Sequence, residues 1–99
     1  MNYTALMALR ELILVNARLI YNPDFYKTDV LTAESMEEIG KYEASLAASR
    51  DRLVKPLIGT PPCRTREEAM QVLLEYTEKI VATEFHQMAY RKTTEAYGS

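Results

Sequence analysis

Apolar residues recur along the N-terminal segment at the three- to four-residue spacing of a helix. One side of this predicted helix carries an aliphatic row of Leu6, Leu9, Leu12, Ile13, Leu19 and Ile20, and a second apolar row beside it holds Tyr3, Met7, Leu14, Ala17 and Tyr21. The helix is expected over residues 3–21, because the residue before a proline is disfavoured in helical conformation and Asn22 precedes Pro23. So broad an apolar surface predicts contacts with two neighbouring elements.

A second helix is expected over residues 33–54. It would begin at Thr32, or at Ser35, whose spacing to Glu38 fits a capping box. Its apolar residues are Met36, Ile39, Leu46, Leu53 and Val54, and the breakers that follow are Pro56, Gly59, Pro61 and Pro62. No strand is predicted, because no segment is interpreted as alternating between apolar and polar residues with many β-branched side chains.

A third helix is expected over residues 66–96, opened by a capping box between Thr65 and Glu68. At ~1.5 Å per residue it would be ~45 Å long, so its C-terminal third would extend beyond a first helix of under ~30 Å. These patterns predict an all-α fold: a three-helix up-down-up bundle with a long C-terminal helix, in which residues 1–99 form a single domain.

Composition places the chain among ordinary globular proteins, with 47% hydrophobic and 26% charged residues and a net charge of −2. The single cysteine, Cys63, cannot form an intramolecular disulfide, which favours a reducing compartment. The N-terminal segment lacks the features of a signal peptide, and no apolar run is long enough to span a bilayer. A cytoplasmic protein without a membrane partner is therefore expected.

No pattern indicates catalysis, a cofactor or a metal. The only histidine, His86, has no metal-ligating residue one turn away, and Cys63 has no nearby base, although two arginines and a following helix start would favour its thiolate. Acidic residues at the predicted helix starts are explained by the helix dipole. The protein is predicted not to be an enzyme.

Asn16 interrupts the apolar row of the first helix. A polar side chain among Leu12, Ile13, Leu19 and Ile20 must be partnered if it is buried. We expect Asn16 to be buried and hydrogen-bonded to a neighbouring element.

The favoured function is a protein-interaction module: an adaptor, an inhibitor or a regulatory subunit of a larger host machine, of the kind that phages and plasmids encode. The partner would be another protein or a second copy of the chain. Tyrosine, phenylalanine and methionine are enriched at interface cores. The predicted interface residues lie at the end of the third helix and in the first loop: Phe85, Met88, Tyr90, Tyr97, Tyr21, Phe25 and Tyr26. The loop aromatics could equally cover the core.

Nucleic-acid binding is the alternative. Basic residues gather in the segment 50–66, as Arg50, Arg52, Lys55, Arg64 and Arg66. Acidic stretches flank this segment and the sequence pI is about 5.4, so nucleic acid is the weaker expectation.

The loop that contains Gly59, Pro61 and Pro62 has two interpretations. Prolines pre-order an extended chain and could make it a recognition loop. They also follow helix ends as stiff connectors.

Overall fold

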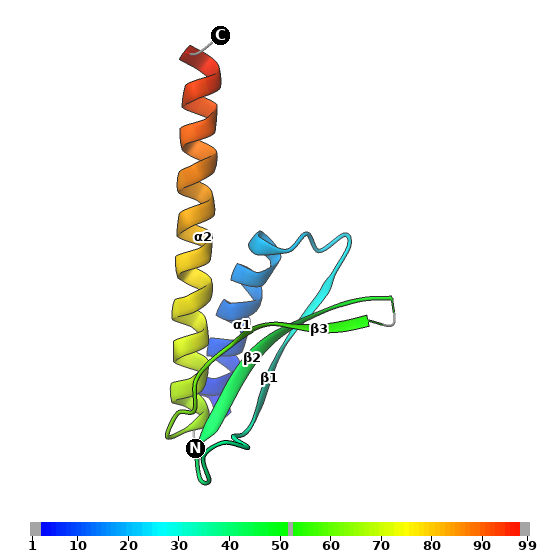
Figure 1. The fold of residues 1–99 in the computed structure, drawn as a ribbon, viewed down its shortest axis with the longest axis vertical. Helices are drawn as coiled ribbons and strands as arrows, with labels where there is room; N and C mark the ends of the chain where they lie inside the picture. The colour runs from blue at the N-terminus through cyan, green and yellow to red at the C-terminus, as the bar shows by residue number, and fades with distance from the viewer. Residues whose placement is uncertain (1–2, 52, 98–99) are drawn as a thin grey trace.

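The chain folds in the order α1-β1-β2-β3-α2 (Figure 1) in a computed structural model that describes residues 3–51 and 53–97, with side chains described outside 53–57 and 85–97. Helix α1 is Tyr3–Ile20 and helix α2 is Arg66–Tyr97. Between them lie strands β1 (Lys27–Glu34), β2 (Tyr42–Arg50) and β3 (Leu53–Gly59). The predicted all-α three-helix bundle is wrong, because the protein has an α+β arrangement of two helices and a three-stranded antiparallel sheet.

The first and third predicted helices are confirmed to within one residue at each end. The hydroxyl Oγ1 of Thr65 accepts the backbone N–H of Glu68 at 3.0 Å, which is the predicted N-cap of α2. At the end of α1, the N–H of Tyr21 donates to the carbonyl of Ala17 at 2.7 Å before Pro23 diverts the chain.

The predicted second helix is wrong, and a β-turn motif around Ser35 explains why. Ser35 Oγ accepts the N–H groups of Glu37 and Glu38 at 3.1 and 3.2 Å, as a helix cap would. Gly40 then adopts φ 78°, and the N–H of Ser35 donates to the carbonyl of Lys41 at 2.8 Å. The left-handed residue reverses the chain, so the capping pattern closes a hairpin instead of starting a helix.

Alternation of buried residues positions the sheet. Ala44, Leu46 and Ala48 in β2 are buried at period two, and Ala47 is also buried where the register with β3 shifts. Val30 is the buried residue of β1. Strand β2 is central and pairs with both neighbours in antiparallel register. Proline has no N–H to donate to a neighbouring strand, so it is found mainly in edge strands. Pro56 fits this rule, because β3 is an edge strand.

Both helices pack beside the sheet and against each other, α1 on β1 and α2 on β2. They run in the same direction (Figure 1), because an odd number of antiparallel strands returns the chain to the end where α1 began. The predicted up-down-up order is therefore wrong. The core joins all layers and comprises Ile13, Leu14, Ala17, Val30, Ala44, Leu46, Cys63, Ala69, Met70 and Leu73. In the part of the chain that the structure describes, no helix is long and apolar enough to cross a membrane.

Helix α2 is continuous and extends well beyond α1 (Figure 1), in a molecule with extents of 57 × 29 × 27 Å. The prediction that the last helix would project past the first is confirmed for its backbone.

Candidate protein-interaction site

A tight turn after α1 shapes the first loop. The carbonyl of Asn22 accepts the N–H groups of Phe25 and Tyr26 at 3.0 and 3.1 Å. Its side-chain Oδ1 accepts the N–H of Asp24 at 2.9 Å. Asparagine favours such turns because its amide can satisfy the backbone locally. The turn therefore holds Phe25 and Tyr26 in fixed positions before β1 begins.

The three aromatic residues of this loop have different environments. Tyr21 is half-buried against the core, and its ring meets Tyr26 edge to face with centroids 6.3 Å apart. Burial, and then the carboxylate of Glu84, raise the pKa of the Tyr21 phenol. Tyr26 is 37% exposed and Phe25 is 56% exposed. Tyr21 thus supports the loop from the core side, while Phe25 belongs to the surface.

Phe25 is covered by a cation from the far end of β2. The guanidinium carbon of Arg50 lies 5.5 Å from the centre of the Phe25 ring, within the range of a cation–π contact. Arg50 is the last residue of β2, and Asp51 follows it with φ 58° in the turn to β3. Sheet pairing therefore brings together two residues that are far apart in sequence. We call Phe25, Tyr26 and Arg50 the aromatic–arginine surface.

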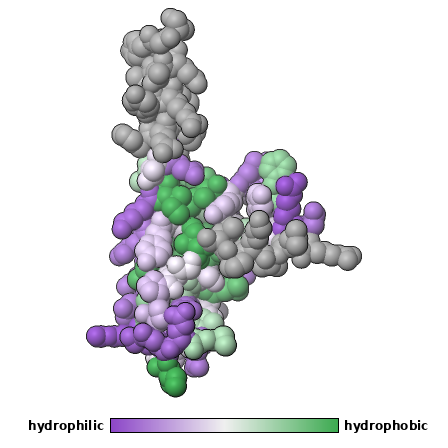
Figure 2. Space-filling model, viewed as in Figure 1, coloured by the Kyte–Doolittle hydropathy of each residue, from purple (hydrophilic) through white to green (hydrophobic). Residues whose placement is uncertain are grey.

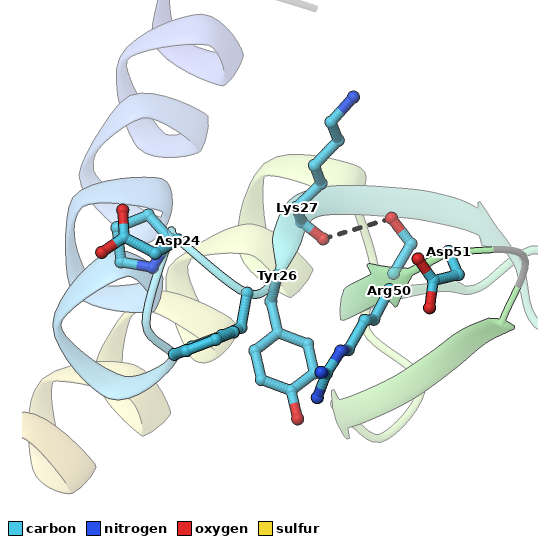
Figure 3. Close-up of a pocket in the computed structure, with 8 residues that line it drawn as sticks. Asp24, Tyr26, Lys27, Arg50 and Asp51 are labelled. Atoms are coloured by element: carbon cyan, nitrogen blue, oxygen red, sulfur yellow. Dashed lines mark hydrogen bonds between the residues drawn. The ribbon is translucent and has the colours of Figure 1, made fainter.

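A groove of about 500 Å³ opens beside the aromatic–arginine surface. The residues that line it are Pro23, Asp24, Phe25, Tyr26, Lys27, Ser49, Arg50 and Asp51. In Figure 3 the Tyr26 ring and the Arg50 guanidinium extend to the same side of the strands, and the Lys27 ammonium extends to the opposite side. The Ser49 hydroxyl donates to the Lys27 carbonyl at 3.4 Å, which ties the two walls together. The groove offers aromatic, cationic and anionic groups at once.

The predicted basic patch is not brought together. Arg50 lies at one end of β2, whereas Arg66 stacks at 5.2 Å over the ring of Tyr42 at the other end, about 26 Å away along the strand. Arg64 directly precedes α2 and is close to Arg66 in the chain. Arg52 and the side chain of Lys55 lie outside the described residues. The described arginines of the predicted patch therefore lie in two separate places on the molecule.

The segment with Gly59, Pro61 and Pro62 is tied to the sheet. The N–H of Thr60 donates to the carbonyl of Ala44, and the N–H of Ala44 donates to the Thr60 side-chain Oγ1, both at 3.0 Å. Cys63 pairs with Tyr42 through two backbone bonds of 2.7 and 2.8 Å. Pro61 is exposed and Pro62 half-buried between these anchors. Backbone hydrogen bonds thus hold the chain on both sides of the two prolines, as expected of a stiff connector.

Cys63 is a core residue, and its burial opposes the thiolate that its neighbours in the sequence would favour. Its side chain is 6% exposed, and the Sγ atom donates to the carbonyl of Pro61 at 3.3 Å. Burial, followed by the Glu68 carboxylate, raises the pKa of the thiol, since both disfavour the negative charge. Burial therefore outweighs the neighbouring arginines and the helix start, which were expected to lower the pKa of this thiol.

A second apolar surface was missed at the turn between β1 and β2. Met36 and Ile39 were assigned to the apolar residues of the predicted second helix, but they are 101% and 104% exposed. Figure 2 shows a strongly hydrophobic group protruding at the lower end of the molecule, where Figure 1 places this turn. This surface was missed because the segment was assigned to a helix, whereas it forms the turn of a hairpin.

The predicted interface at the end of α2 lies on side chains outside those the structure describes: Phe85, Met88, Tyr90 and Tyr97. Among the described residues, no group of three or more histidine, cysteine, aspartate or glutamate side chains could hold a metal ion.

Comparison with known proteins gives no relative from which a role could be transferred. No protein-family model, no curated protein and no solved structure matches this chain.

Proposed function

We propose that this protein is a non-enzymatic interaction module that holds a partner protein against the aromatic–arginine surface. The observation that carries the proposal is Phe25: its ring is 56% exposed, yet it is held by an ordered turn and covered by Arg50. A single exposed apolar residue is ordinary, but Phe25 is grouped with Tyr26 and Arg50 beside a groove, and such a grouping supports a contact site.

The chemistry of the surface favours a protein as the ligand. Aromatic residues and arginine are enriched at the centres of protein interfaces, where they carry a large share of the binding energy. The residues that line the groove also include Asp24, Lys27 and Asp51, in addition to Arg50. This mixed lining suits a partner loop with its own charges better than an apolar small molecule, whose pockets are mainly hydrophobic.

A role as an adaptor, inhibitor or regulatory subunit in the cytoplasm fits this surface. Cys63 is a free thiol packed in the core, which supports a reducing compartment. The projecting part of α2, with Phe85 and Met88 as anchors, remains part of the proposal as a second contact surface.

The experiment that tests the proposal compares variants of the full chain in an affinity pull-down from the native cell, read by mass spectrometry. Phe25→Ser combined with Arg50→Ser should lose the specific partner. Leu31→Ser is the matched control, because Leu31 is 51% exposed but lies on β1 away from the groove. A partner retained by both variants alike would assign binding to another surface, which Phe85→Ala with Met88→Ala would then test.

A further inference from the structure

Helix α1 has an apolar face that no described part of the chain covers. Its core face, with Ile13, Leu14 and Ala17 buried, packs toward α2 and the sheet. On the opposite side, Leu12, Val15 and Leu19 are 53%, 50% and 53% exposed. The two neighbours that the sequence predicted for this helix are α2 and β1, and neither of them covers this side.

The exposed residues form a narrow seam. Ala8, Leu12, Val15 and Leu19 are separated by four, three and four residues, and all four are exposed. At about 100° per residue they fall within about 60° of one another around the helix axis. This is the a/d spacing of a two-helix coiled coil, in which side chains of one helix pack between those of another. We call these four residues the α1 seam.

Charges beside the α1 seam indicate which helix fits it. Glu11 and Arg18 each directly precede a seam leucine, so both lie on the same flank. When two copies of α1 pack antiparallel, with Leu12 against Val15 and Ala8 against Leu19, Glu11 of each copy faces Arg18 of the other. A parallel pair would place Glu11 near Asn16 and form no such ion pair.

Among the residues that the structure describes, the Glu11 carboxylate has one long ion pair, with Arg10. The Arg10 guanidinium lies 3.8 Å from the Glu11 carboxylate, but its close partner is Asp29, at 2.6 Å. The Glu11 side chain is 61% exposed. Because the two charges are of opposite sign and related by the two-fold axis, the seam is self-complementary.

We infer that the α1 seam is a self-association surface through which two copies of this chain pair as antiparallel helices. The seam is short, about 16 Å between Ala8 and Leu19 at 1.5 Å per residue, so the dimer is weak and concentration-dependent. The inference uses a different surface from the proposed function and does not depend on it.

Sedimentation equilibrium on the full chain, from about 10 μM to about 1 mM, tests the inference. We expect a monomer–dimer equilibrium that Leu12→Gln with Leu19→Gln weakens by about tenfold or more. Leu31→Gln, which changes an equally exposed leucine on β1, should leave it unchanged. A chain that stays monomeric throughout, or a dimer that the double variant does not weaken, would overturn the inference.

The antiparallel orientation has its own test. Glu11→Arg should weaken the dimer by about fivefold, because it places like charges opposite each other at two symmetric positions. Adding Arg18→Glu should restore the affinity, since it exchanges the signs and keeps both pairs. A double variant no tighter than Glu11→Arg alone would rule out this pairing.

Discussion

Asn16 of α1 donates a hydrogen bond from Nδ2 to the Oγ1 atom of Thr77 in α2, at 3.1 Å. Thr77 is fully buried, and its hydroxyl in turn donates to the carbonyl of Leu74 at 2.9 Å. The predicted hydrogen bond of Asn16 is confirmed, although its side chain is half-buried and not fully enclosed. This polar contact fixes how the two parallel helices lie along each other.

Removing this contact should lower stability by a measurable amount. Asn16→Leu deprives the buried Thr77 oxygen of its donor, and we expect a loss of about 1 kcal/mol in the free energy of unfolding. Thr77→Val should cost a similar amount. In a double-mutant cycle by urea denaturation, the two losses should be less than additive by about 1 kcal/mol. Strict additivity would show that the two side chains do not interact.

Replacing Gly40 tests the hairpin, because the change in stability should have opposite signs in a hairpin and in a helix. Gly40 has φ 78° and an added Cβ would meet nothing within 4 Å, so Gly40→Ala should destabilise by about 1 kcal/mol through backbone strain alone. In the helix first predicted here, the same change would stabilise by about the same amount. Gly59→Ala is the control, because Gly59 also has open space but no positive φ. Equal effects of the two changes in thermal unfolding would argue against the turn.

The buried thiol makes stability dependent on alkaline pH. The folded state raises the pKa of Cys63, so the unfolded chain loses this proton at a lower pH than the folded one. The stabilisation is therefore fully present below the unfolded pKa of about 8.5 and is lost as the pH rises through the folded value. Urea titrations at increasing pH should show that the free energy of unfolding falls above this pH. The Cys63→Ala variant should show a smaller fall.

The burial of Cys63 also predicts that its thiol reacts slowly with added reagents. Cys63 should react with a thiol reagent far more slowly in the folded protein than in urea, since only 6% of it is exposed. Equal rates in the two states would contradict its place in the core.

Nucleic-acid binding should be weak. Arg50 and Arg66 lie at opposite ends of β2, so the described arginines do not present one continuous phosphate-binding face. In a mobility-shift assay at low salt we expect no DNA or RNA complex, and no effect of Arg64→Glu with Arg66→Glu. A salt-sensitive complex that this double variant abolishes would restore the alternative.

The two helices could be predicted because their signals are local. Pro23 ends α1 and Thr65 caps α2, and neither depends on distant residues. The middle of the chain could not be assigned from propensity, since the alanines of β2 favour a helix. They lie in a central strand because small side chains let α2 pack close to the sheet. The alternation of Thr28, Val30 and Thr32 in β1 was the available strand signal.

The aromatic residues of the candidate site stand out in the sequence, and Arg50 was singled out as a basic residue, but its position over Phe25 was not predictable. Phe25 and Tyr26 stand out in sequence as surplus aromatic residues after a helix end. Their neighbour Arg50 is brought to them by the pairing of β1 with β2, in which Lys27 lies opposite Ser49. Non-local pairing of this kind leaves no mark in the local pattern of the chain.

The most direct test of the proposed function is the affinity of the captured partner for the full chain, measured by isothermal titration calorimetry. Truncating a central aromatic anchor should cost about 2 kcal/mol or more, so Phe25→Ser should weaken binding roughly thirtyfold. Leu31→Ser should bind as the parent does. If Phe25→Ser binds as tightly as Leu31→Ser, the aromatic–arginine surface is not where the partner is held.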